Sequence, residues 1–104
     1  MKIVYSKKFN EEKLPYVEKK LFKKRIAELQ SCKNLGEMQY GRPHLLRAKY
    51  TGSFGIRLGK ISRLILFPIE IDPEYYTNRN GRHIKHFVTG IVIGYSPNHY
   101  RSFY

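Results

Sequence analysis

Basic and aromatic residues concentrate in the second half of the chain, in a pattern suited to binding a polyanion. Lysine and arginine side chains hold phosphates, and tyrosine rings stack on bases. The cations of this group are Arg47, Lys49, Arg57, Lys60 and Arg63, and its aromatic residues are Tyr50, Tyr95, Tyr100 and Tyr104. His44 precedes the group and His99 follows it, which adds a hint of acid–base chemistry. The pattern predicts binding of RNA or DNA. The alternative for Arg57 and Arg63 is simple solvation of a strand face.

Motifs for other kinds of site are missing from the sequence. His83 and His86 lie three residues apart but lack a third metal ligand nearby. The glycine patterns of phosphate loops and dinucleotide folds do not occur. No serine or cysteine lies in a nucleophile motif, and Cys32 is expected to pack at a helix end. We therefore expect no metal and no cofactor.

The first third of the chain predicts one strand and one helix that support this group. Residues 2–6 are short and β-branched, as in a strand. A helical period then runs from Pro15 to Cys32, after an Asn10 cap followed by two acids. Its apolar face consists of Leu14, Val17, Leu21, Phe22, Ile26 and Leu29. The basic run along residues 19–25 is interpreted as a solvated face, with a phosphate or partner contact as the alternative.

After a turn region at residues 33–43, the period changes to two. Residues 44–50, 53–58 and 61–67 predict three strands in a tight antiparallel meander. A loop is expected over residues 69–85, followed by a last strand at 87–95 that Ser96-Pro97-Asn98 ends. One strand, one helix and four antiparallel strands define a small α+β domain.

Size and charge limit the classes of function. The 104 residues make up a single domain, residues 1–104, with a modest core. The formal net charge of +12 calls for an anionic partner, whether nucleic acid, an acidic protein or an anionic membrane. Nine tyrosines without tryptophan favour base stacking over membrane anchoring. A single cysteine and a charged N-terminus without a signal sequence predict a cytoplasmic protein that does not act at a membrane.

Several segments together resemble one protein family, the plasmid-maintenance killer proteins. These form the HigB-like branch of the RelE/ParE toxin superfamily. The resemblance covers about residues 26–100, apart from the loop at 69–86, and the chain before residue 26 is shorter than usual for the branch. It rests on Glu28-Leu29, Asn34-Leu35, Gly41-Arg42-Pro43-His44-x-Leu46, Gly52-Ser53-Phe54-Gly55-Ile56-x-Leu58, Arg63-Leu64-Ile65-x-Phe67-Pro68, Val88-Thr89-Gly90-Ile91-Val92-Ile93 and the terminal Asn98-His99-Tyr100.

The resemblance implies a RelE-like domain whose N-terminal strand and helix, or helical hairpin, pack on an antiparallel sheet. It also implies a toxin of a type II toxin–antitoxin system, an endoribonuclease that cleaves mRNA on the ribosome and blocks translation. Its partner would be a helix-turn-helix, HigA-like antitoxin. The matching catalytic positions are His44, Arg63, His99 and Tyr100. Binding of RNA phosphates would fall to Arg47, Lys49, Arg57, Lys60 and Asn98.

The C-terminal match departs from the family pattern in a way that affects catalysis. The family ends Asp-Tyr-His where this chain has Asn98, His99 and Tyr100, so the aromatic ring and the imidazole are exchanged. In an extended strand that exchange sends each side chain to the opposite face. In a turn, which Pro97 favours, both can reach His44, with Tyr100 the nearer. Two other functions remain open: a ParE-type toxin that inhibits DNA gyrase, and an RNA- or ribosome-binding domain without catalysis.

Overall fold

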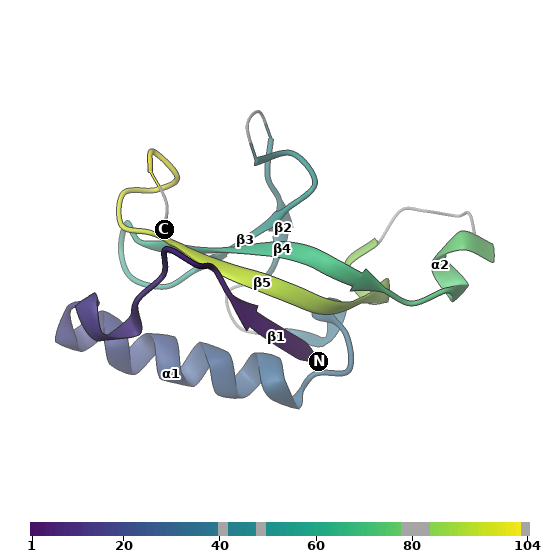
Figure 1. The fold of residues 1–104 in the computed structure, drawn as a ribbon, viewed down its shortest axis with the longest axis horizontal. Helices are drawn as coiled ribbons and strands as arrows, with labels where there is room; N and C mark the ends of the chain where they lie inside the picture. Colours follow the sequence, from purple (N-terminus) through teal and green to yellow (C-terminus); the bar gives the residue numbers. More distant parts are fainter. Residues whose placement is uncertain (40–41, 48–49, 78–83, 103–104) are drawn as a thin grey trace.

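A long helix packs against a five-stranded sheet in the computed structural model, which describes residues 1–39, 42–47, 50–77 and 84–102 (Figure 1). The elements are β1 (Lys2–Tyr5), α1 (Tyr16–Ser31), β2 (His44–Leu45), β3 (Phe54–Arg57), β4 (Arg63–Ile71), α2 (Glu74–Thr77) and β5 (Val88–Ser96). Short 3-10 turns cover Glu11–Lys13, Leu35–Glu37 and Ile84–Phe87. The predicted α+β class is confirmed, as is the order of strand, helix and antiparallel strands.

The predicted helix is confirmed as α1, with Pro15 as its N-cap residue. Phe22, Ile26 and Leu29 recur at helical spacing and are buried against the sheet. The helix ends where Cys32 adopts an extended conformation, and this cysteine is buried at the helix end as expected. Val17 was wrongly assigned to the buried face: it is 68% exposed, and Leu14, just before the helix, turns into the core instead.

The sheet has the strand order β1-β5-β4-β3-β2. The meander is confirmed, because β2, β3, β4 and β5 pair antiparallel in sequence order. The pairing of β1, which the sequence did not predict, is parallel: this strand lies at the edge of the sheet beside β5. No hairpin turn joins β1 to β5, so no turn imposes an antiparallel direction on this pair.

Two of the predicted strands differ from those observed by more than one residue at an end. β2 ends at Leu45 instead of residue 50, because the chain then turns and the Tyr50 amide donates to the Arg47 carbonyl at 3.3 Å. β4 continues past the predicted end to Ile71, and its register shifts after Pro68. Such a shift accommodates a residue that cannot donate to the ladder. The predicted loop therefore starts later and contains α2, and its residues 78–83 lie outside the described part.

The two faces of the sheet are covered differently. Alternate residues of β3, β4 and β5 face α1 and form the apolar core, which includes Phe54, Ile56, Leu64, Leu66, Ile91 and Ile93. On the opposite side, the segment after β5 and the connection from β2 to β3 rise from the sheet (Figure 1). Among the described residues, none of the helices combines the length and apolarity needed to cross a membrane.

Candidate RNA-binding and catalytic site

Strand pairing gathers several predicted residues on the sheet face opposite α1. His44 of β2 lies opposite Gly55 of β3, and Gly55 lies opposite Ile65 of β4. Two residues further on, Arg57 lies opposite Arg63. Because side chains of directly paired residues share a face, His44 and the two arginines project to the same side of the sheet. Phe54 and Ile56, which alternate with them, are in the core on the other side.

The chain turns sharply after β5, and this C-terminal turn (residues 96–102) folds back over that face. Pro97 ends the strand as predicted. The Asn98 carboxamide organises the turn, since its oxygen accepts from the Ser102 amide at 2.9 Å and its nitrogen donates to the Ser102 hydroxyl at 2.9 Å. His99 and Tyr100 both have positive φ, at 55° and 73°. Non-glycine residues rarely adopt this conformation, so the turn is held by the bonds around it.

Tyr100 lies over the centre of the site. Its backbone amide donates to the Ser96 hydroxyl at 2.7 Å. Its ring centroid is 6.4 Å from that of His44, edge to face, and 6.2 Å from that of Tyr50. Its hydroxyl points at Gly55, where a Cβ atom would be only 2.0 Å away. A side chain on residue 55 would therefore prevent this arrangement.

The Tyr100 hydroxyl is buried and has no hydrogen-bond partner among the described residues. A buried polar group of this kind costs free energy, so its persistence calls for an explanation. Burial raises the pKa of the phenol, and the nearby Arg63 charge opposes this rise only in part. Tyr100 thus remains protonated at neutral pH, where it can donate a proton but cannot accept one.

His99 is exposed and lies beside Tyr100, with ring centroids 5.2 Å apart. Its backbone amide donates to the Ile61 carbonyl at 2.9 Å, which ties the C-terminal turn to the connection between β3 and β4. The structure thus brings Tyr100 next to both histidines. Of the two residues exchanged relative to the family pattern, it is Tyr100 whose ring contacts His44.

Arg63 is partly buried, and backbone oxygens hold its guanidinium group. Nη1 donates to the carbonyls of Ser62 at 2.8 Å, Gly59 at 3.2 Å and Lys60 at 3.3 Å. These carbonyl oxygens orient the guanidinium group without neutralising its positive charge. No described carboxylate forms an ion pair with Arg63 or with Arg57 opposite; the pairs Lys19–Glu12 and Arg25–Glu28 involve the helix side instead. Like charges directly opposite on a sheet destabilise it, so this pair favours an external anion.

The remaining predicted phosphate contacts are less closely placed. Arg47 and Lys60 are exposed, in the connections that follow β2 and β3. The side chain of Asn98 is engaged within the C-terminal turn. Lys49 lies outside the described residues. Within the part of the chain that is described, no three histidine, cysteine or acidic side chains come together as a metal site.

Sequence reasoning missed two residues on which the site depends. Gly55 gives Tyr100 room to approach, and Ser96 holds the Tyr100 backbone. A glycine between the apolar residues of a strand signals such a close approach, so Gly55 could have been found. Ser96 offers no comparable signal, because its role depends on how the turn folds back.

Comparison of the chain with protein-family models, curated proteins and solved structures finds no match in any of the three.

Proposed function

We propose that this chain is a HigB-like member of the RelE superfamily, the toxin of a type II toxin–antitoxin pair. Its activity would be cleavage of mRNA on the ribosome without a metal. One observation carries the proposal: the buried Tyr100 hydroxyl, which has no hydrogen-bond partner among the described residues, lies beside His44, on the same sheet face as two arginines that pair with no described carboxylate. The sequence resemblance and the net charge of +12 support the same conclusion.

The chemistry assigns one role to each of three side chains. His44 takes the proton of a ribose 2′-hydroxyl, whose oxygen bonds to the adjacent phosphorus. As the bond from phosphorus to the 5′-oxygen breaks, Tyr100 gives that oxygen a proton. Arg63, assisted by Arg57, stabilises the charge on the phosphate oxygens. Burial raises the pKa of Tyr100, so it keeps its proton and can serve only as the acid, which leaves His44 as the base.

The buried Tyr100 hydroxyl, for which the described residues provide no hydrogen-bond partner, has a role in this scheme. A leaving oxygen of RNA would give the Tyr100 hydroxyl the partner that the free protein lacks. The bound RNA must reach a group that is covered in the free protein, so we expect the C-terminal turn to shift when RNA binds. His99, exposed beside Tyr100, would be an auxiliary residue in this arrangement.

The antitoxin would silence the toxin by covering the same face. Arg57 and Arg63 call for carboxylates on the partner, and the high positive charge predicts fast association that salt slows. The helix-turn-helix character of the antitoxin is carried by the family resemblance alone.

Single-turnover cleavage of an mRNA on programmed ribosomes tests the proposal. His44→Ala, Arg63→Ala and Tyr100→Phe should each lower the cleavage rate about 100-fold or more. Matched controls lie on α1: Tyr16→Phe removes an exposed hydroxyl, and Lys24→Ala removes an exposed charge. Both should cleave like the wild type. Products with a 2′,3′-cyclic phosphate and a 5′-hydroxyl are expected, and wild-type rates in all three site variants would refute the scheme.

A domain that binds RNA without cleaving it is the second candidate. The observation in its favour is that the Tyr100 hydroxyl is covered in the free protein. Mapping RNA 5′ ends after brief induction separates the candidates. Discrete cuts indicate a nuclease, whereas growth arrest with bound but intact RNA indicates a binder. Inhibited DNA supercoiling without cuts would indicate a gyrase inhibitor.

A further inference from the structure

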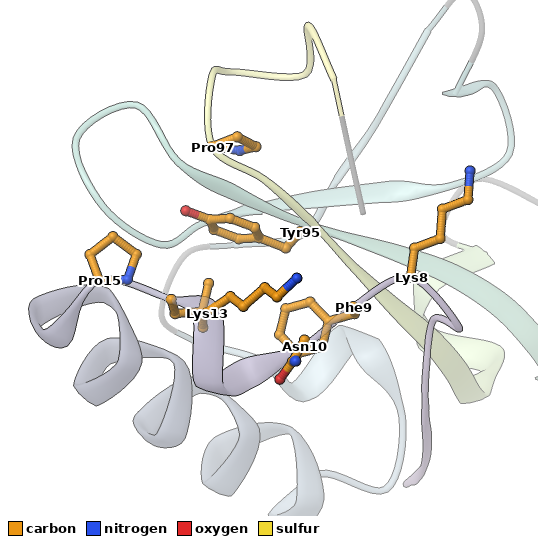
Figure 2. A pocket seen from close by; sticks show the side chains of 8 residues that line it. Lys8, Phe9, Asn10, Lys13, Pro15, Tyr95 and Pro97 are labelled. Atoms are coloured by element: carbon orange, nitrogen blue, oxygen red, sulfur yellow. The ribbon is translucent and has the colours of Figure 1, made fainter.

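A pocket lies beside Pro97, at the start of the C-terminal turn. It forms where the segment leading into α1 passes the end of β5, and its volume is about 440 Å³. This lies within the range of about 300–1,000 Å³ that is usual for small-molecule sites. It is lined by Lys8, Phe9, Asn10, Lys13, Leu14, Pro15, Tyr95 and Pro97 (Figure 2).

The walls of the pocket combine flat apolar groups with two cations. Phe9 and Tyr95 meet edge to face, with ring centroids 6.3 Å apart. Both lysines are exposed, and Figure 2 shows Lys13 extending toward the space between the two rings, with Lys8 on the opposite side. No described carboxylate forms an ion pair with Lys8 or Lys13. Flat rings beside uncompensated cations suit a planar aromatic group that carries negative charge.

The chain connects this pocket directly to the candidate site. Pro97 lines the pocket, while its neighbour Ser96 holds the backbone of Tyr100 and pairs across the sheet with Arg63. A single strand of RNA bound at Arg63 therefore has to pass only the C-terminal turn to reach the pocket. An acidic peptide would satisfy the lysines, but it would leave the flat walls without a matching group.

We propose that this pocket binds one nucleotide of single-stranded RNA next to the reacting phosphate, with its base against the wall that Phe9 and Tyr95 form and a phosphate at Lys8 and Lys13. The inference rests on the proposed RNA-directed function and adds a subsite to it. It implies that RNA long enough to cover both places binds more tightly than RNA that covers only the sheet face.

Binding of fluorescent single-stranded RNAs of three and six nucleotides tests the subsite. The variant Lys8→Ala/Lys13→Ala should bind the hexamer about tenfold more weakly and the trimer almost unchanged. The slope of log affinity against log salt should fall by about 0.7, since the subsite holds one phosphate and each neutralised phosphate contributes about 0.7. Lys24→Ala/Lys33→Ala, which removes two exposed charges elsewhere, is the matched control and should keep the wild-type slope. Phe9→Leu keeps an apolar side chain without a flat ring and should also weaken hexamer binding about tenfold.

The outcomes separate the subsite from the proposed function. Loss of hexamer affinity in the lysine variant beyond that of its control supports the subsite, even if the chain cleaves nothing. Equal losses of hexamer affinity in Lys8→Ala/Lys13→Ala and in Lys24→Ala/Lys33→Ala overturn the subsite, even if the wild type cleaves mRNA. If a peptide rich in glutamate and leucine displaces nothing from the wild type, the peptide alternative is excluded. If the peptide binds at Lys8 and Lys13 while the hexamer does not, the pocket is a protein-docking site and the proposal is wrong.

Discussion

The two faces of the sheet hold buried tyrosines in opposite states. On the α1 face, the Tyr95 hydroxyl donates to the Glu18 carboxylate at 2.5 Å, and its ring belongs to the apolar core. On the other face, the Tyr100 hydroxyl is buried against Gly55 and has no hydrogen-bond partner in the described part of the chain. The first arrangement satisfies a polar group and closes the core. The second leaves a polar group unsatisfied beside cations that also lack carboxylate partners.

This difference separates a face organised for stability from the face that carries the proposed cleavage site. A core face gains from complete burial and paired polar groups. A site that awaits a ligand leaves donors and charges for the ligand to satisfy, and it does so at a cost in stability. Ile65, which pairs with Gly55 and shares this second face, is fully buried, so the face also removes apolar area from water.

The largest expected effect is on the core face. Phe22 is 1% exposed and contacts Phe9, with ring centroids 5.0 Å apart. Phe22→Ala should lower the free energy of unfolding by about 3–5 kcal/mol, because it leaves a cavity under the sheet. Urea denaturation measures the change. His44→Ala on the opposite face is the comparison and should stay within about 0.5 kcal/mol of the wild type. Similar losses in both variants would contradict the division between the faces.

Gly55→Ala should produce the next largest effect, by forcing Tyr100 out of place. The new methyl group would overlap the Tyr100 hydroxyl and its ring carbon, which lie 2.0 Å and 2.8 Å from the ideal Cβ position. We expect a loss of about 1–3 kcal/mol in unfolding free energy. Combined with Tyr100→Phe, which removes the nearer atom, the loss should be smaller than the sum of the two single changes. If the changes in unfolding free energy of the two single variants, measured by urea denaturation, add up to that of the double variant, Tyr100 does not pack against Gly55.

Removing each buried hydroxyl tests the comparison directly. Tyr95→Phe should cost about 1.5–3 kcal/mol, since it breaks a hydrogen bond to a charged group. Tyr100→Phe should be neutral or stabilising by up to about 1 kcal/mol, because it removes a buried group that has no partner. Thermal and urea unfolding of the two variants measure this contrast. If Tyr100→Phe proves the more damaging, its hydroxyl has a structural partner and the argument for an unsatisfied donor fails.

The elements that follow a regular pattern could be predicted from the sequence, and those set by long-range contacts could not. The helical period gave α1 to within one residue of each predicted end, and alternation gave β3 and the face that carries Arg57. The parallel pairing of β1 with β5 escaped prediction because no local turn encodes it. The early end of β2 escaped as well, because the segment around Tyr50 has the composition of a strand but folds as a turn.

For the site, chemistry was easier to predict than arrangement. Residue types and the family resemblance named His44, Arg63 and Tyr100 as candidates, and Pro97 predicted the turn that follows β5. Nothing local predicts that this turn takes positive φ at two successive residues, which directs Tyr100 back over Gly55. The pocket at Lys8 and Lys13 was missed for a related reason, since its two walls come from opposite ends of the chain.

The smallest expected effect is a dependence of stability on alkaline pH. The pKa of Tyr95 is raised by burial and further by the Glu18 carboxylate, and that of Tyr100 is raised by burial. A phenol with a raised pKa keeps its proton longer in the folded state than in the unfolded state, where it titrates near 10. Its contribution to stability is therefore complete below about pH 10 and is lost as pH rises toward the folded pKa.

Urea midpoints measured from pH 8 to pH 11 should fall. Tyr95→Phe should remove more of this dependence of the midpoint on pH than Tyr100→Phe, because the Tyr95 phenol faces a carboxylate in addition to being buried. Tyr16→Phe, exposed on α1, should leave the slope unchanged. If only Tyr100→Phe abolished the dependence on pH, the tyrosine with the more strongly raised pKa would lie on the face opposite α1 and not on the core face.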